Sequence, residues 1–242
     1  MLQRLTTSIY YLPFESETDR PILFYIRGKK ESVAIDAGNS TAHVQKFYQA
    51  LKEENLPLPS KTIITHWHWD HTFGLSSIHG KSYGTRKTYE KLEQVKHWEW
   101  NEEAMKERER TGEDIAFCNQ CIRLEYGDLS QIRVVNLDEI IDSETHWDIG
   151  GVELVLYPRD STHTRDSLFI HIPSEECLIV ADADWVDSYD NHDKYDAQRL
   201  ESMISFFEQL DYEKHLISHG LWLSKQEALL ELKNLPSDRI TY

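Results

Sequence analysis

The chain has 242 residues, of which 40% are hydrophobic and 28% are charged, as expected for a folded protein with a substantial core. Its formal net charge of −16 argues against broad binding to nucleic-acid backbones, because like charges repel. No apolar run approaches the roughly 18 residues that a membrane span requires, and the first residues lack the apolar core of a signal peptide. We therefore expect a cytoplasmic protein that binds neither nucleic acid nor membrane, and the sequence leaves its oligomeric state open.

The first 65 residues predict short strands, then one helix and a further strand. Strands are expected at residues 8–12, 22–27 and 32–35. Ser40 or Thr41 caps a predicted helix whose apolar positions, from Val44 to Leu51, recur at helical spacing. Residues 61–65 are then predicted as a strand that ends directly before a histidine-rich segment.

Residues 85–125 differ from the rest, because charged and aromatic residues alternate there with helical periodicity. Helices are predicted at 87–96, 98–110 and 115–124. We interpret the segment as a helical insertion in a single domain spanning residues 1–242, either solvated or folded over the site as a lid. Cys118 and Cys121 form a C-x-x-C within it; without a second cysteine pair we interpret them as reduced thiols on a helical face, and their role stays open.

The second half returns to strands followed by helices. Strands are predicted at 132–135, 152–157, 168–172, 178–181 and 215–218, and helices at 198–210 and 224–232, the latter capped by Ser224. Each half thus offers strands first and a helix after, which suits two sheets packed face to face with helices outside.

The densest functional signal is His66-Trp67-His68-Trp69-Asp70-His71, which follows the apolar run 62–64. Imidazole and carboxylate groups are the ligands that suit zinc and, in other geometries, iron or manganese. Because side chains at i and i+2 of an extended chain point to the same side, His66 and His68 are expected to bind one ion. Asp70 and His71 can then face a second ion.

Three more potential ligands follow separate predicted strands. His163 lies in the polar loop after strand 152–157, Asp182 closes strand 178–181, and His219 follows strand 215–218. A folded sheet brings such strand ends into one cleft.

These motifs resemble those of the metallo-β-lactamase fold superfamily, whose hallmark is T-H-x-H-x-D-H after a buried strand. The chain has Thr65 to His71 in that pattern, preceded by Ile35-Asp36-Ala37-Gly38 and followed by His163-Thr164, Asp182 and Ser218-His219-Gly220. The five motifs occur in the family's order across residues 35–220. The resemblance implies an α+β fold, a four-layer αββα sandwich.

The resemblance also implies a site with two divalent ions, with zinc expected and iron or manganese as alternatives. It assigns His66, His68 and His163 to the first ion and Asp70, His71 and His219 to the second, with Asp182 bridging. Asp36 would hold the geometry of the site without touching metal. Asp184, two residues beyond Asp182, is the alternative bridging residue.

The chemistry implied is hydrolysis of a small molecule, whose ester, lactone, thioester, amide or phosphoester centre is attacked by a hydroxide bridging the two ions. Asp70 is the expected catalytic residue, moving a proton between water and leaving group. Two alternatives stay open: a mononuclear iron oxygenase of sulfur compounds on the same fold, and a metal-binding protein without turnover.

The walls of the site are less clearly encoded. Trp185 is the expected aromatic wall residue, with Trp98, Trp100 and Trp222 as other candidates, whereas Trp67 and Trp69 are expected to pack against the sheet. Arg159 and Arg165 flank His163 and are predicted either to hold an anionic substrate or to form structural ion pairs. Asp160-Ser161-Thr162 and Ala181 replace residues that are usually Pro-Gly-x and Gly in the family, which alters the cleft walls. The other histidines are expected in the surface or core: His43, His79, His97, His146, His171, His192 and His215.

Overall fold

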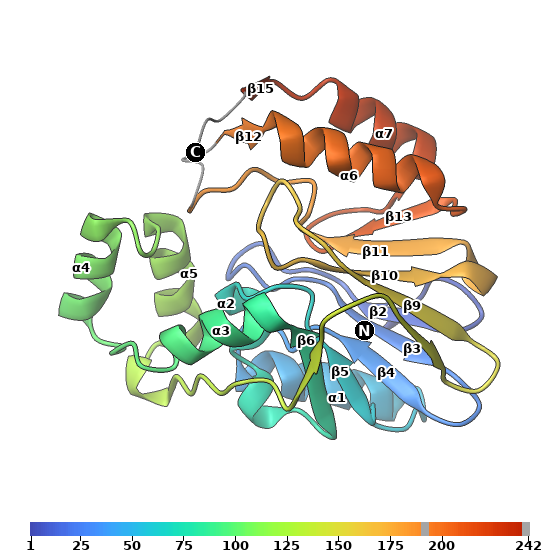
Figure 1. Cartoon of the computed structure of the whole chain (residues 1–242). Coiled ribbons are helices and arrows are strands. Elements are labelled where there is room, and N and C mark those ends of the chain that lie inside the picture. The colour runs from blue at the N-terminus through green and yellow to red at the C-terminus, as the bar shows by residue number, and fades with distance from the viewer. Residues whose placement is uncertain (190–193, 239–242) are drawn as a thin grey trace.

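The structure, a computed structural model, describes residues 1–189 and 194–238. Two sheets pack face to face, and helices cover the outer face of each (Figure 1). The expected αββα sandwich is confirmed.

The first sheet is antiparallel at one side and parallel at the other. Its strands follow in chain order, and β4, β5, β6 and β7 run parallel to one another. The strands are β1 (Gln3–Arg4), β2 (Ile9–Leu12), β3 (Leu23–Arg27), β4 (Ser32–Ile35), β5 (Lys61–Ile63), β6 (Lys81–Thr85) and β7 (Glu139–Ile141). Because parallel strands end at the same edge, the residues after β4 and β5 lie side by side there.

The second sheet has the order β14-β13-β11-β10-β9-β8, and only its β11–β13 pair is parallel among the described strands. That pair brings the residues after β11 and β13 to one edge. The strands are β8 (Thr145–Asp148), β9 (Glu153–Pro158), β10 (Leu168–Ile172), β11 (Cys177–Ala181), β13 (Lys214–Ile217) and β14 (Leu223–Ser224); β12 (Tyr195–Asp196) and β15 (Ser237–Asp238) form a separate parallel pair.

The core between the sheets is made of aliphatic side chains from both inner faces. Ile26 and Ile35 of the first sheet and Leu154 and Ile170 of the second belong to this cluster and are fully buried. Burying such side chains contributes about 1.5–3 kcal/mol each, so this layer holds the two sheets in register.

Amphipathic helices cover the outer faces. On the first sheet, α1 (Thr41–Glu53) packs through Phe47 and Leu51, and its cap is Ser40, whose side chain accepts from the amide of His43. On the second sheet lie α6 (Ala197–Gln209) and α7 (Lys225–Lys233), the latter capped by Ser224 as predicted.

The segment predicted as an insertion forms three helices: α3 (Arg86–Val95), α4 (Glu102–Thr111) and α5 (Ala116–Tyr126). α3 contacts β6 and β7, whereas α4 and α5 extend beyond one end of the sandwich, at the left of Figure 1. Trp67 and Trp69 pack among these helices, with Met105 and Ile122, so their predicted packing against the sheet is wrong. Cys118 and Cys121 are buried on α5 with free thiols.

The predicted strand at residues 132–135 is also wrong. This segment is irregular, and Ile132 packs with α5 instead of pairing with a neighbouring strand. The strand partner of this region is β7, a few residues later, which pairs with β6. The sequence pattern does not predict the strands β6, β7 and β8, because each is short and carries polar residues or Gly84 within its apolar pattern.

Within the described residues, no helix combines the length and the apolar character needed to cross a bilayer.

Candidate metal centre

The seven predicted ligands converge at one end of the sandwich, each placed by the end of a strand. His66 and His68 follow β5, and the single-turn helix α2 (Trp69–Thr72) carries Asp70 and His71. His163 comes from the loop between β9 and β10, while Asp182 and His219 follow the parallel strands β11 and β13. Residues up to 153 positions apart in the sequence thereby form two clusters of potential ligand atoms.

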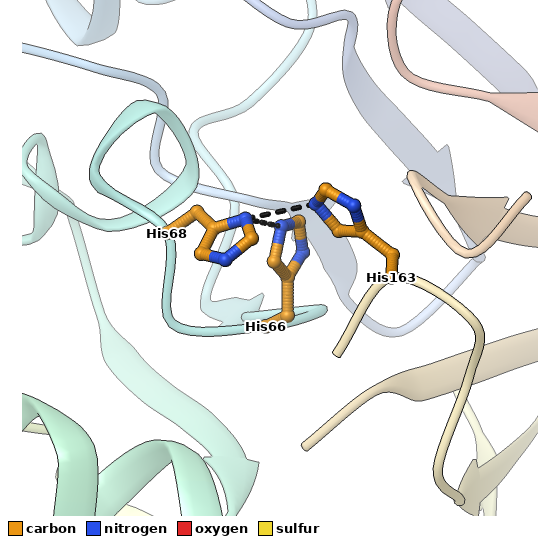
Figure 2. Close-up of side chains that lie close together, drawn as sticks. All are labelled: His66, His68 and His163. Atoms are coloured by element: carbon orange, nitrogen blue, oxygen red, sulfur yellow. Dashed lines mark hydrogen bonds between the residues drawn. The ribbon is translucent and has the colours of Figure 1, made fainter. Parts of the chain in front are cut away.

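The first cluster consists of three imidazoles. His68 Nδ1 lies 3.0 Å from His66 Nε2 and 2.8 Å from His163 Nε2, so three ring nitrogens point at a common position (Figure 2). His66 and His68 are buried and His163 is nearly so.

The second cluster combines two imidazoles with two carboxylates. Asp70 Oδ2 lies 2.9 Å from His71 Nε2 and 3.1 Å from His219 Nε2. Asp182 Oδ2 lies 3.0 Å from the same nitrogen of His71 and 3.4 Å from that of His219.

Asp182 lies between the two clusters. Its Oδ2 is also 3.8 Å from His66 Nε2 and 3.9 Å from His163 Nε2, so it reaches the ligand atoms of both. Asp184, the alternative bridging residue, instead contacts His215 Nε2 at 2.7 Å and takes no part in either cluster.

Most ligand imidazoles have their second nitrogen held by another group. Asp36 Oδ2 contacts His71 Nδ1 at 2.7 Å, and the same carboxylate accepts from the amide and hydroxyl of Thr65. The Thr65 hydroxyl lies 3.0 Å from His66 Nδ1, and the Val186 carbonyl accepts from His163 Nδ1 at 3.0 Å. His219 Nδ1 is 3.5 Å from Asp19. Such contacts fix the ring orientation and leave the other nitrogen directed into the site.

The backbone adopts unusual conformations where it presents the carboxylates. Asp36 has φ of 64° and Ala181 has φ of 54°, in the left-handed region that side chains other than glycine rarely occupy. The β11–β13 register also shifts between Ile179 and Ala181. Together, the irregularity and the left-handed residue turn the chain so that Asp182 enters the site.

The polar residues that replace Pro-Gly before His163 are held by hydrogen bonds. Thr162 donates to the carbonyls of Ala183 and Trp185, and Ser161 accepts from the amides of His163 and Thr164. The loop that carries His163 is thereby tied to the segment following Asp182, which fixes the distance between two ligands.

The clusters differ in their electrostatics. Burial lowers the pKa of His66 and His68 well below the ordinary value, and neighbouring imidazoles lower it further. Burial alone would lower the pKa of His71 too, but Asp70 and Asp36 raise it well above its ordinary value. Likewise, His219 and His71 outweigh burial at Asp182 and hold the pKa of its carboxyl well below the usual range.

The sequence model of the metallo-beta-lactamase superfamily matches residues 23–242. The chain belongs to this superfamily. No curated protein matches it in sequence.

Solved structures of this superfamily share the fold at low sequence identity. A metallo-beta-lactamase from Pontibacter korlensis is 15% identical, with a TM-score of 0.61 and coverage of 97% of this chain and 99% of the other. A metallo-beta-lactamase of Pseudomonas aeruginosa, in its mono-zinc form, is 13% identical with a TM-score of 0.65, covering 96% and 93%. A sec-alkyl sulfatase double mutant is 14% identical with a TM-score of 0.64, and the match covers 96% of this chain but 40% of the sulfatase.

The residues of both clusters fit divalent metal ions. His68 Nδ1 lies 3.0 Å from His66 Nε2 and 2.8 Å from His163 Nε2. An imidazole nitrogen makes one hydrogen bond in the plane of its ring, so the three nitrogens cannot all be paired with one another. Asp182 Oδ1 is buried and has no hydrogen-bond partner among the described residues. A metal ion coordinated by these atoms would give a partner to the unpaired imidazole nitrogen and to the Asp182 oxygen. Zinc is commonly bound by histidine nitrogens alone or together with carboxylate oxygens.

A pocket of about 490 Å³ opens above the two clusters. Its floor is formed by ligand residues, and its walls come from α5, the segment after Asp182 and the loop before β3. The wall residues are Phe14, Ser16, Asp19, Ile115, Phe117, Cys118, Trp185, Val186, Ser188 and Tyr189. The predicted insertion therefore contacts the site through the start of α5.

The predicted wall residues are only partly placed here. Trp185 lines the pocket, whereas Trp222 lines a neighbouring one, and Trp98 and Trp100 stack on Arg108 within the insertion. Neither Arg159 nor Arg165 lines the pocket. His192 lies outside the described residues.

Sequence reasoning missed several residues of the site. Asp19 and Tyr189 lie in stretches without family motifs; Asp19 contacts His219, and the Tyr189 ring packs on His68 with centroids 5.0 Å apart. Burial and the nearby Asp70 raise the pKa of Asp19 to about 7. An acidic residue in a turn gives no signal by itself, so only the fold could reveal it.

Proposed function

We propose that the chain is a metal-dependent hydrolase that holds two divalent ions, zinc in the first instance, and cleaves an ester-type bond in a small molecule. The observation that carries this proposal is the position of Asp182, whose Oδ2 lies 3.0–3.9 Å from ligand nitrogens of both clusters. A carboxylate so placed serves two adjacent sites, as a dinuclear centre requires.

The chain's own residues have distinct roles in this proposal. His66, His68 and His163 would hold one ion, and Asp70, His71 and His219 the other, with Asp182 shared. When bound, two such ions lower the pKa of a coordinated water to about 7 and polarise the oxygen of the scissile bond. Asp70, at the boundary between the second cluster and the pocket, would carry a proton toward the leaving group.

Metal analysis combined with kinetics tests the proposal. We expect about two zinc ions per chain and hydrolysis of at least one compound in a small panel of esters, lactones, thioesters and phosphodiesters. Chelation should abolish this activity, and adding zinc should restore it. Asp70→Asn should lower kcat at least roughly a hundredfold, while Asp184→Asn, outside both clusters, should leave it unchanged.

Two results would contradict the proposal. One iron per chain without any hydrolysis would favour the mononuclear oxygenase. Two bound ions with no turnover, and an Asp70→Asn variant indistinguishable from the wild type, would favour a protein that only binds metal.

A further inference from the structure

The pocket above the clusters has acidic and metal-ligating groups at its base and apolar side chains around its mouth. Asp70 and Asp182 lie at the base and Asp19 in the wall, whereas the exposed side chains of Phe14, Phe117 and Trp185 surround the opening. Among the described residues that line it, there is no lysine or arginine. A substrate anion lying in this pocket away from the ions would therefore meet Asp19 and apolar surface, with no lysine or arginine in the described pocket lining to pair it.

The two arginines nearest to His163 in the sequence have other partners. The guanidinium of Arg159 lies 3.8 Å from the centroid of the Phe206 ring, on the outer face of the second sheet. Arg165 lies 3.8 Å from Asp160 and lines two grooves outside the pocket. One of these grooves, which also contains Lys87 and Lys91, adjoins the pocket at His68 and Tyr189. Neither arginine lines the pocket itself, so an anionic group inside the pocket would have neither of them as a partner.

Two aromatic side chains of the pocket wall are about half exposed to solvent. Phe117 is 57% exposed and Trp185 is 51% exposed, although both face the pocket. Phe14 lines this pocket and also a second apolar pocket, formed with Ile22, Leu216 and Trp222. Because burying apolar surface is favourable, a ligand that covers these side chains binds more tightly.

We propose that the substrate is an uncharged carboxylic ester or lactone with an apolar substituent, which lies along Phe117, Trp185 and Phe14. This inference rests on the proposed hydrolase function and specifies its substrate class. In the reaction, the oxygen of water bonds to the acyl carbon and the bond from that carbon to the alkoxy oxygen breaks. One water proton passes to the departing alkoxide, and the other is released as the carboxylic acid ionises.

Two matched series of p-nitrophenyl esters test the proposal with the zinc-loaded protein. The first has acyl chains of two to eight carbons, and the second has the same lengths with a terminal carboxylate. We expect kcat/KM in the neutral series to rise roughly fourfold for each methylene that the wall buries. The carboxylated ester of equal length should react at least roughly tenfold more slowly.

A charge placed on the wall should change this preference. Phe117→Lys puts a cation at an exposed position of α5, so folding should be unaffected. We expect the ratio of kcat/KM for the neutral ester to kcat/KM for the carboxylated ester of equal length to fall at least roughly tenfold. Leu230→Lys is the matched control, because Leu230 is 63% exposed on α7 and does not line the pocket. It should leave the ratio unchanged.

The outcomes separate this inference from the function beneath it. Zinc-dependent hydrolysis that is independent of chain length, or faster with the carboxylated esters, would overturn the substrate class and leave the hydrolase proposal standing. The absence of zinc-dependent hydrolysis of every ester, lactone, thioester and phosphodiester offered would overturn both.

Discussion

Buried histidines occur both in the two clusters and elsewhere in the molecule, but their ring nitrogens have different partners. In the two clusters, His66, His71 and His163 each have one nitrogen held by a neighbour while the other points at a shared position. On β13, His215 has both nitrogens occupied, by Tyr212 and Asp184. On α1, neither nitrogen of His43 has a partner among the described residues.

This difference separates the predicted ligands from the structural histidines. Burial does not, since His43, His71 and His215 are all fully buried. The predicted ligands His66, His71 and His163 each combine one restrained nitrogen with a second nitrogen that converges with other donor atoms. Asp182 and Asp184 form the same contrast among carboxylates, because only Asp182 has an oxygen directed at both clusters.

The largest expected effect comes from Asp182→Asn, compared with Asp184→Asn. The first change removes the charge that both clusters share, so we expect fewer than two bound ions and a loss of activity of roughly a thousandfold. The second should leave metal content and activity near those of the wild type. Metal analysis of both purified variants, beside their kinetics, is the measurement. Equal losses in the two variants would mean that the distinction between these carboxylates is wrong.

A smaller effect is expected from Asp36→Asn, which weakens the group that orients His71. The carboxylate is buried and contacts His71 Nδ1 at 2.7 Å, so we expect the affinity for the second ion to fall roughly 10- to 100-fold. Titration against a chromophoric chelator measures the two affinities separately.

Thr65→Val, which removes the hydroxyl beside His66 Nδ1, should instead lower the affinity for the first ion more than the affinity for the second. A variant with altered activity but unchanged affinity for either ion would contradict this role.

The sequence predicts the fold and the positions of the proposed ligands much better than it predicts the residues of the pocket. The ligands occur in short motifs after buried strands, and the strands β4, β10 and β11 follow from their apolar runs. Short strands with polar or glycine residues, such as β6, give no such pattern, because their pairing depends on neighbours distant in the chain. The alternation of Trp67 and Trp69 with the histidines predicts that they point away from the site, but it does not predict that helices of the insertion, and not the sheet, pack on them.

The pocket residues could not be predicted for a related reason. Phe14, Asp19 and Phe117 lie on three separate segments, and each has an ordinary local context. Only the position of α5 beyond the end of the sandwich brings Phe117 near Asp70. The proposed specificity would therefore depend on the tertiary placement of the insertion, whereas the predicted ligands lie at strand ends that the local sequence pattern identifies.

The smallest effect concerns His43, the buried histidine without hydrogen-bond partners. Burial, together with the nearby Arg20, lowers the pKa of His43 to about 3, against about 6.5 in the unfolded chain. Between these values the unfolded state binds a proton that the folded state does not, so stability falls as the pH decreases through 6.5. From pH 8 to pH 5 this residue should remove about 2 kcal/mol from the free energy of unfolding. His43→Leu should lose correspondingly less over that range, because leucine cannot be protonated in either state. Urea unfolding of both proteins at pH 8 and pH 5 measures the difference, and equal losses would show that His43 does not remain neutral in the fold.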